Sequence, residues 1–142
     1  MPVVSVTRLR VRSWRFLPIF FLYALRSTRQ ATRAPGNLAT RLFTDRNSVF
    51  WTATTWATEA AMKRFMVSGV HGRAMRKLRY WCDEAALVHW TQEHDAMPTW
   101  SEAHARLQSE GRRSKVNHPS PAHLTLRFPE PRSTSRGEVR IK

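Results

Sequence analysis

The stretch from Val49 to Cys82 constrains the fold of this chain more than any other part of the sequence. It begins with the alternating pattern of a β-strand over Val49 to Trp56 and runs directly into a helical pattern. Thr58 is the expected N-cap of this helix, because its hydroxyl can accept a hydrogen bond from a free backbone N–H group. The helix weakens at Ser68-Gly69, and a second helical piece follows from Gly72. We therefore expect a strand followed by an interrupted helix at the centre of the chain.

The flanking segments complete the pattern. Residues 3–12 alternate with period two and predict a first strand, and a helix is expected from Leu17 until Pro35-Gly36 ends it. Residues 38–43 form a second strand, which the polar turn at residues 45–48 joins to the 49–56 strand as a hairpin. Residues 86–90 mark a fourth strand. The order strand, helix, strand, strand, helix, strand predicts a ferredoxin-like βαββαβ α+β fold, an antiparallel sheet with both helices on one face.

The last third of the chain is expected to add one more helix and an arm. Thr99 or Ser101 would cap the helix and Gly111 would end it. Residues 114–131 contain several prolines and little periodicity, which predicts an extended arm that lies on the fold or on a partner. Composition predicts disorder for residues 129–142. The expected organisation is a single domain over residues 1–128, followed by a tail.

A homodimer is expected from the second face of this sheet. That face would present Trp and Phe side chains to water, which costs roughly 25 cal/mol per Å² of apolar area. Pairing with a second copy would remove this cost. We therefore predict a homodimer in which the two sheets face each other.

The net charge of +14 is distributed unevenly. Residues 1–44 contain eight Arg and no acidic residue, residues 45–110 are balanced, and the excess returns in residues 111–142. A nucleic-acid-binding domain would place its basic stripe on the folded face, with aromatic residues between the charges. We expect no specific nucleic-acid binding, only a weak attraction to anionic surfaces.

Two features bear on the cellular location. The one long apolar run, residues 16–25, has about half the length of a membrane span, and no convincing signal-peptide cleavage site follows it. Cys82 is the single cysteine, so the chain has no internal disulfide, and we expect it to be a small buried residue. These features predict a cytoplasmic protein without a transmembrane segment.

Five segments carry a resemblance to a known superfamily: RQATRAPGNL (Arg29 to Leu38), FWTATTW (Phe50 to Trp56), EAAMKRFMVSGVHGRAM (Glu59 to Met75), WCDEAALVHW (Trp81 to Trp90) and SKVNHPSPAH (Ser114 to His123). With its elements in this order, the chain resembles the dimeric α+β barrel superfamily that includes antibiotic-biosynthesis monooxygenases. More narrowly, it resembles bacterial proteins of the spheroidene-monooxygenase-like and monooxygenase-like groups.

The resemblance implies a monooxygenase-like homodimer that acts on, or binds, a hydrophobic small molecule in a barrel cavity. The superfamily includes cofactor-free oxygenases, haem proteins and proteins without a known activity, so the implied cofactor is either none or haem. A non-catalytic dimer that binds a ligand or a partner is the alternative. Cofactor-free oxygenases of this kind activate O₂ through an electron-rich substrate anion, in a dry cavity with a hydrogen-bond network.

His71 is the candidate catalytic residue, because it lies between Gly69 and Gly72, where the backbone can approach a ligand closely. It would act as a proton carrier, a hydrogen-bond partner of the substrate or a haem ligand. In the alternative interpretation, His71 caps the second helical piece and bonds a backbone carbonyl.

A second set of candidates would bind the substrate. Aromatic side chains would line an apolar pocket, and hydroxyl or imidazole groups would supply the few polar contacts that such pockets use. Alternatively, these aromatic rings fill the core and the dimer interface. The candidates are Trp51, Thr52, Thr54, Trp56, Phe65, His89 and Trp90.

No metal site is expected. The six His residues do not have the spacing of a zinc motif with a nearby acid. Asp83 and Glu84 are neighbours at the turn from helix to strand, where we expect one to cap the helix and the other to be solvated.

Overall fold

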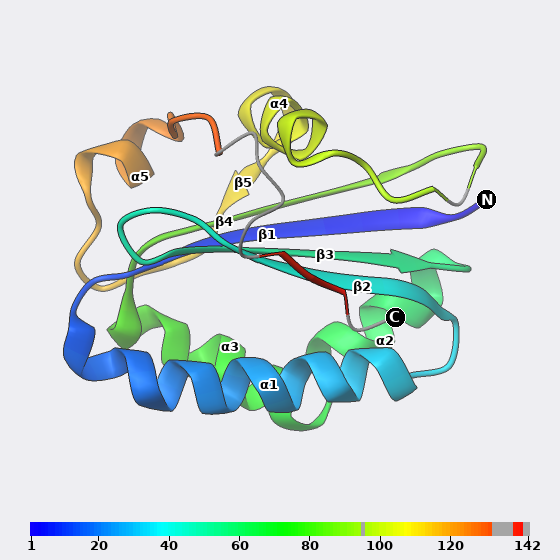
Figure 1. Cartoon of the computed structure of the whole chain (residues 1–142), viewed down its shortest axis with the longest axis horizontal. Helices are drawn as coiled ribbons and strands as arrows, with labels where there is room; N and C mark the ends of the chain where they lie inside the picture. Colours follow the sequence, from blue (N-terminus) through cyan, green and yellow to red (C-terminus); the bar gives the residue numbers. More distant parts are fainter. Residues whose placement is uncertain (95, 132–137, 141–142) are drawn as a thin grey trace.

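In the computed structural model, the protein has three layers (Figure 1). The described residues are 1–94, 96–131 and 138–140, and the side chains of Val70, His71, Met75 and Arg140 lie outside the description. A β-sheet forms the middle layer, with α1, α2 and α3 below it and α4 and α5 above it in Figure 1.

The sheet has the order β5-β4-β1-β3-β2-β6, and all neighbouring strands are antiparallel. The ferredoxin-like α+β fold predicted from the sequence is confirmed, because β1 pairs with both β3 and β4 at its centre. The strands are β1 (Val3–Val11), β2 (Asn37–Thr44), β3 (Val49–Trp56), β4 (Cys82–Thr91), β5 (Arg112–Arg113) and β6 (Glu138–Arg140).

The lower layer consists of α1 (Leu17–Arg33), α2 (Glu59–Val67) and α3 (Gly69–Trp81), with the short helix η1 (Trp14–Phe16) before α1. Pro18 occupies the first turn of α1, where a missing N–H group costs nothing. After α1 the chain turns at Gly36, whose φ is 89°. A side chain there would bring a Cβ atom within 2.7 Å of the Ala61 Cβ, so glycine is required both by its φ and by the packing of α2.

The central stretch folds as the sequence predicts, except that the second helical piece begins at Gly69 and not at Gly72. The Thr58 hydroxyl accepts a hydrogen bond of 3.1 Å from the Ala61 N–H group and caps α2. The helix stops at Ser68, and α3 begins at Gly69, whose φ is 55°. A left-handed residue cannot continue an α-helix, so it separates α2 from α3.

The upper layer consists of α4 (Trp100–Glu110), α5 (Pro121–Thr125) and the segments that flank α5. The Thr99 hydroxyl caps α4 as expected, at 3.1 Å from the Glu102 nitrogen. The arm is not fully extended, because Ser120 caps the short helix α5 that the sequence did not predict. The arm lies on its own chain, where Val116 and Phe128 are buried.

The bare sheet face that motivated the homodimer prediction does not exist in this chain, which corrects that argument. Ala103 and Leu107 of α4 and Phe128 of the arm form one core with the side chains of the upper sheet face. As a result, Trp51 is 0% exposed within a single copy. The last third of the chain therefore covers the sheet face that we expected a second copy to cover.

Part of the segment expected to be disordered belongs to the sheet. Residues 138–140 form the edge strand β6, which pairs with β2. The Trp100 indole N–H group donates a hydrogen bond of 3.1 Å to the Glu138 carboxylate and joins this strand to α4.

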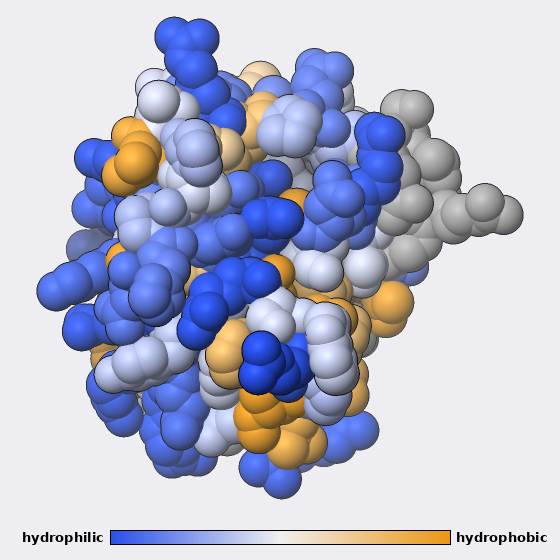
Figure 2. All heavy atoms as spheres, turned by 90° about the vertical axis from the view of Figure 1, so that its left-hand side faces the viewer, coloured by the Kyte–Doolittle hydropathy of each residue, from blue (hydrophilic) through white to orange (hydrophobic). Residues whose placement is uncertain are grey.

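The end of the molecule at which α1 begins has a largely hydrophilic surface (Figure 2). Hydrophobic side chains gather in its lower part, on the side of the helical layer. None of the described helices combines the length and the apolar character that a transmembrane span requires.

Replacing Leu107 with Ala is expected to lower the free energy of unfolding by about 2–5 kcal/mol, because it opens a cavity under α4. Leu124→Ala is the matched control, since Leu124 is 57% exposed and its loss should change stability by less than about 0.5 kcal/mol. Urea denaturation measures both values. Equal small effects of the two changes would show that α4 does not seal the sheet.

Candidate functional site

A cavity of about 100 Å³ lies between the sheet and the lower helical layer. Most of its wall is apolar, and hydroxyl groups supply the polar part. Such a composition suits a small hydrophobic ligand that carries one or two polar atoms. The lining residues are Ser5, Thr7, Leu9, Phe20, Tyr23, Ala24, Ser27, Thr28, Ala31, Leu42, Thr52, Thr54, Trp56, Met62, Phe65, Met66, Ala74, Leu78, Trp81 and Leu87.

The strand register brings hydroxyl groups together on the sheet side of this cavity. Thr7 of β1 pairs with Thr52 of β3, and Ser5 pairs with Thr54 two residues further along. Residues opposite each other in an antiparallel pair have Cβ atoms about 5 Å apart. The central strands β1 and β3 therefore place four hydroxyl side chains in two adjacent rows.

The hydroxyl groups of the cavity wall differ in their hydrogen bonding. The Thr54 hydroxyl accepts a bond of 2.8 Å from the Trp56 indole N–H group, and the Thr28 hydroxyl donates to the Ala24 carbonyl at 3.0 Å. The Ser27 Oγ is buried and has no hydrogen-bond partner. Because a buried unpaired hydroxyl costs about 1–3 kcal/mol, Ser27 is the polar group of this wall that gains most from a ligand.

Four of the predicted substrate-binding residues line the cavity together: Thr52, Thr54, Trp56 and Phe65. The Trp56 and Phe65 rings stack with centroids 5.1 Å apart. This contact holds α2 against the end of β3 and closes one side of the cavity.

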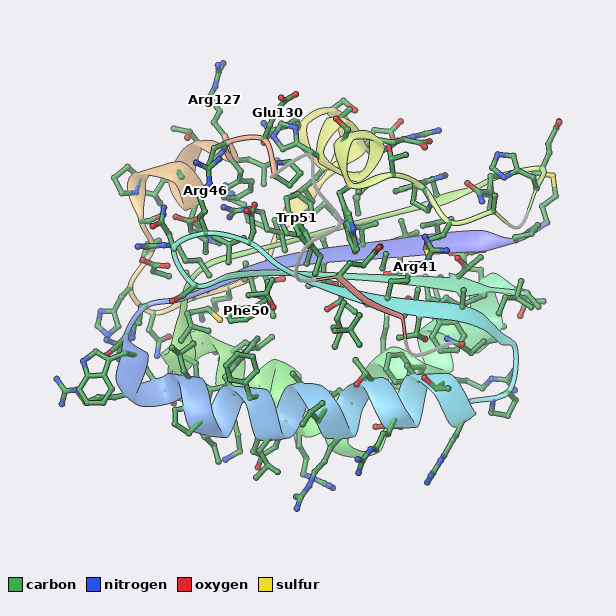
Figure 3. The ribbon with its side chains drawn as sticks, viewed as in Figure 1. Arg41, Arg46, Phe50, Trp51, Arg127 and Glu130 are labelled. Carbon is green, nitrogen blue, oxygen red and sulfur yellow. The ribbon has the colours of Figure 1, made fainter. Side chains whose placement is uncertain are left out.

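Trp51 and Trp90 lie on the other face of the sheet, which corrects the prediction that they share a pocket with the threonines. Successive side chains of a strand point to opposite faces of the sheet, so Trp51 cannot lie on the same face as Thr52. In Figure 3, Phe50 lies on the α1 side of the sheet and Trp51 on the α4 side. Trp90 belongs to the core under α4, and the Arg106 guanidinium lies 4.9 Å from its ring centroid.

Of the two predicted histidines, only His89 has a described side chain. His89 pairs with Ser5 across β4 and β1, at the end of a hydroxyl row, but it is not part of the cavity wall. The backbone of His71 belongs to the first turn of α3, and its side chain lies outside the described part of the protein. Its catalytic role therefore remains a prediction.

A second polar site, on the upper side of the sheet, was missed by the sequence analysis. The Arg8 guanidinium donates a hydrogen bond of 2.6 Å to the Glu84 carboxylate, and both side chains are buried. The Ser120 hydroxyl donates to the other Glu84 oxygen at 2.8 Å, and Phe128 covers Arg8 with its ring centroid 4.1 Å away. The expectation that one residue of the Asp83-Glu84 pair caps the helix and the other is solvated is wrong for Glu84.

One signal in the sequence points to this ion pair. Arg8 follows Val4 and Val6 at the same parity in β1, so the apolar face of this strand continues into a charged residue. Such a charge is buried only with a partner. The partner, Glu84, is 76 positions away and could not be identified from the pattern.

A pocket of about 370 Å³ opens beside this ion pair. Three arginines and three carboxylates line it, so its charges nearly cancel. Figure 3 shows Arg46 and Glu130 on this side of the sheet. Its residues are Arg8, Arg10, Asp45, Arg46, Asn47, Val49, Glu84, Pro129 and Glu130.

Burial shifts the pKa values of three groups around this ion pair. It lowers the pKa of the Arg8 guanidinium, although Glu84 acts in the opposite direction. It raises the pKa of Asp83, although the Arg10 guanidinium lies 2.6 Å away. It also lowers the pKa of His123, and the nearby Arg113 lowers it further.

The tautomer of His123 follows from its hydrogen bond. The Ala85 backbone N–H group donates to the His123 Nδ1 at 3.2 Å. An N–H donor requires a ring nitrogen without a proton, so His123 is neutral with its proton on Nε2. It joins α5 to β4 in this form.

Neither thiol nor metal chemistry is indicated in the described part of the chain. Burial raises the pKa of the Cys82 thiol to about 12, so Cys82 is a buried neutral residue at physiological pH. No three His, Cys, Asp or Glu side chains among the described residues are grouped closely enough to hold a metal ion.

The sequence matches the model of one family, described as Domain of unknown function (DUF3291), over residues 25–136. The chain belongs to this family. The match continues through α4 and the arm, so the upper layer is part of the DUF3291 domain. A comparison with curated proteins gave no match.

Solved structures share the fold at low sequence identity. SnoaB, a cofactor-independent oxygenase from Streptomyces nogalater, was compared as a mutant: it is 18% identical, and the match covers 66% of this chain and 94% of SnoaB with a TM-score of 0.55. Rv0793 from Mycobacterium tuberculosis is 10% identical over 68% of this chain and 99% of its own, with a TM-score of 0.61. An antibiotic biosynthesis monooxygenase is 14% identical, and the match covers 65% of this chain and 99% of the other, with a TM-score of 0.58.

These matches establish the antibiotic-biosynthesis-monooxygenase-like fold for this chain. They cover nearly the whole of the other proteins but leave about a third of this chain without a counterpart.

Replacing Glu84 with Gln is expected to lower the free energy of unfolding by about 3–5 kcal/mol, because Arg8 keeps its charge in a buried site without a counter-ion. Asp83→Asn is the matched control, since its partner Arg10 is partly exposed and the loss should be about 1 kcal/mol or less. Thermal and urea unfolding measure both. A double change, Arg8→Met with Glu84→Leu, should be far milder than Glu84→Gln, and a severe loss there would contradict this explanation.

Acidification is expected to weaken the contact between α5 and β4. The pKa of His123 lies below its ordinary value in the folded chain, so the unfolded chain takes up the proton first. The contribution of His123 is therefore fully present above the ordinary pKa of about 6.5, and it is lost as the pH falls from there through the lower pKa of the folded chain. The free energy of unfolding between about pH 7 and about pH 5 should fall more steeply for the wild type than for His123→Gln. Identical slopes would rule out the neutral His123 contact.

Proposed function

We propose that this protein binds a small hydrophobic molecule in the cavity between the sheet and the lower helices, and that it acts there as a monooxygenase-like protein. The observation that carries the proposal is the buried Ser27 Oγ without a hydrogen-bond partner in the wall of an otherwise apolar cavity. A ligand with one polar atom would pair with this hydroxyl, and its apolar part would fill the remaining space.

The size of the cavity limits the ligand. An apolar cavity of about 150 Å³ in another protein binds benzene, and this cavity measures about 100 Å³. The ligand that fits the observed conformation is therefore no larger than about one aromatic ring. A polycyclic or polyene substrate would require α1, α2 and α3 to move away from the sheet.

The oxygenase activity is the finer part of the proposal. It is supported by the fold that the chain shares with SnoaB, which is described as a cofactor-independent oxygenase. In such chemistry the substrate anion itself supplies electrons to O₂, so the protein must exclude water and hold the anion. Ser27 and Thr52 would donate hydrogen bonds to the substrate oxygen, and His71, one turn before the cavity residue Ala74, would carry the proton.

Haem does not fit this cavity. Pockets for drug-sized ligands have volumes of about 300–1000 Å³, and haem is at least as large as such ligands, whereas this cavity has about 100 Å³. The proposed function therefore uses no haem.

The small volume favours a second candidate function, a non-catalytic protein that binds a ligand or a partner. In this case the apolar side chains mainly serve packing, and the cavity is what remains between them. Oxygen uptake separates the two candidates. With electron-rich single-ring phenols, the oxygenase would consume O₂ in proportion to product, whereas a binding protein would take up none above the rate of the phenol alone.

The homodimer remains a prediction of the resemblance. Because α4 and the arm cover the upper sheet face, two copies would have to meet through another surface than the one first proposed. A cytoplasmic location also remains a prediction.

Ligand binding is expected to raise the melting temperature. A single-ring compound such as phenol at 100 times its Kd should stabilise the fold by about 2.7 kcal/mol, whereas a three-ring compound should have little effect. Ser27→Ala should weaken the binding of phenol about tenfold through the loss of one hydrogen bond, and Ala74→Leu should abolish binding by filling the cavity.

Ser109→Ala makes the same change at an exposed position of α4 and serves as the control. It should bind phenol as the wild type does. Binding that survives Ala74→Leu unchanged would place the ligand elsewhere and contradict the proposal.

A further inference from the structure

Exposed apolar side chains form a stripe on the outer side of the lower layer. Trp14 is 77% exposed, and Pro18, Phe21, Leu22 and Leu25 continue from it at helical spacing along the first half of α1. Exposed hydrophobic side chains also gather on the lower part of the surface in Figure 2, where α1 begins. A contiguous apolar surface of this kind marks a binding surface more often than a solvated one.

The surroundings of this apolar stripe are cationic. Eight basic side chains and no acidic one belong to η1, α1 and α3, and all eight are exposed. In the described part of the chain, none of the eight forms an ion pair with an Asp or Glu side chain. They are Arg15, Arg26, Arg29, Arg33, Arg73, Arg76, Lys77 and Arg79.

We propose that this face, the apolar stripe of α1 with the cations of η1, α1 and α3, docks onto the surface of an anionic lipid bilayer. An interfacial helix has this composition: apolar and aromatic side chains enter the boundary of the acyl chains, and Lys and Arg stay with the headgroups. Trp14 lies at the end of the stripe, and tryptophan prefers the membrane interface. The inference is independent of what the cavity binds.

A second copy of the chain is a poorer occupant. A two-fold contact brings the same surface of both copies together. Here it would set the unpaired cations of one α1 against those of the other, with no acidic residue in residues 1–44 to separate them. An anionic bilayer has the opposite charge and also accepts the apolar stripe.

Nucleic acid is also a poorer occupant. It would satisfy the arginines, but bases stack on aromatic rings, whereas much of the stripe is aliphatic, with Leu22 and Leu25 exposed. The aliphatic side chains have a use only where acyl chains can receive them.

Vesicle flotation of the full chain tests the proposal. The protein should float with vesicles of phosphatidylcholine and phosphatidylglycerol, and should stay behind with phosphatidylcholine alone. Salt at about 1 M should weaken the interaction, because the Debye length falls to about 3 Å. An RNA duplex added as a competitor should displace the protein only weakly.

Two pairs of changes separate charge from apolar insertion. Arg26→Gln with Arg29→Gln should weaken vesicle binding about 30-fold, because each cation near an anionic surface contributes about a fivefold factor. Leu22→Ser with Leu25→Ser should weaken it by at least about tenfold. Both pairs change exposed positions, so melting temperatures close to that of the wild type should accompany the loss.

The matched control removes two charges from the upper side of the sheet. Arg113→Gln with Arg127→Gln changes two exposed residues there: Arg113 donates to the Leu124 carbonyl of α5, and Figure 3 shows Arg127 directed away from the fold. This variant should bind vesicles nearly as well as the wild type. The proposal is overturned if the wild type does not bind anionic vesicles, if both charge pairs weaken binding equally, if RNA displaces the vesicles completely, or if Leu22→Ser with Leu25→Ser converts a dimer to a monomer.

Discussion

The packing of α4 and the arm on the upper sheet face is the interaction on which the rest of this structure depends. Leu107 and Phe128 complete a core in which Trp51 is fully enclosed. Without them, the sheet would expose the apolar surface that requires a partner. The family match extends across this layer, whereas SnoaB and Rv0793, which have the same fold, match about two-thirds of the chain. The DUF3291 domain thus includes its own cover.

This cover divides the molecule into two chemically different sides. Strand alternation sends Thr7, Thr52 and Thr54 to the lower side, where they meet apolar helices around a small cavity. The same alternation sends Arg8 and Glu84 to the upper side, where the arm buries their ion pair. The upper site contributes to holding the arm in place, and the lower site has the hydroxyl without a partner.

Local signals in the sequence predicted much of the fold. Thr58 and Thr99 cap helices where they were expected, and the left-handed Gly69 separates α2 from α3. These features depend on a few neighbouring residues and on backbone sterics. The sequence also predicted the ferredoxin-like arrangement through the succession of elements, because few topologies suit that succession.

The sequence could not predict in the same way which candidate residues lie on which face of the sheet. Both sheet faces are covered, so the 49–56 strand is apolar on both sides, and its pattern does not tell whether Trp51 or Thr52 faces the cavity. The Arg8–Glu84 contact joins positions far apart in the chain. The choice between α4 and a second copy as the cover depended on the tertiary packing of residues 100–128, which periodicity does not encode.

An isotope-filtered NOE experiment on a mixture of labelled and unlabelled protein tests the central claim most directly. If α4 covers the sheet of its own chain, the ring centroids of Trp51 and Trp100 lie 6.3 Å apart and those of Phe43 and Trp100 lie 5.4 Å apart in one copy. NOEs from Trp51 to Trp100 and Leu107 should then occur within one copy and be absent from the filtered spectrum. Filtered NOEs between Trp51 of one copy and the sheet or α4 of another would contradict the claim.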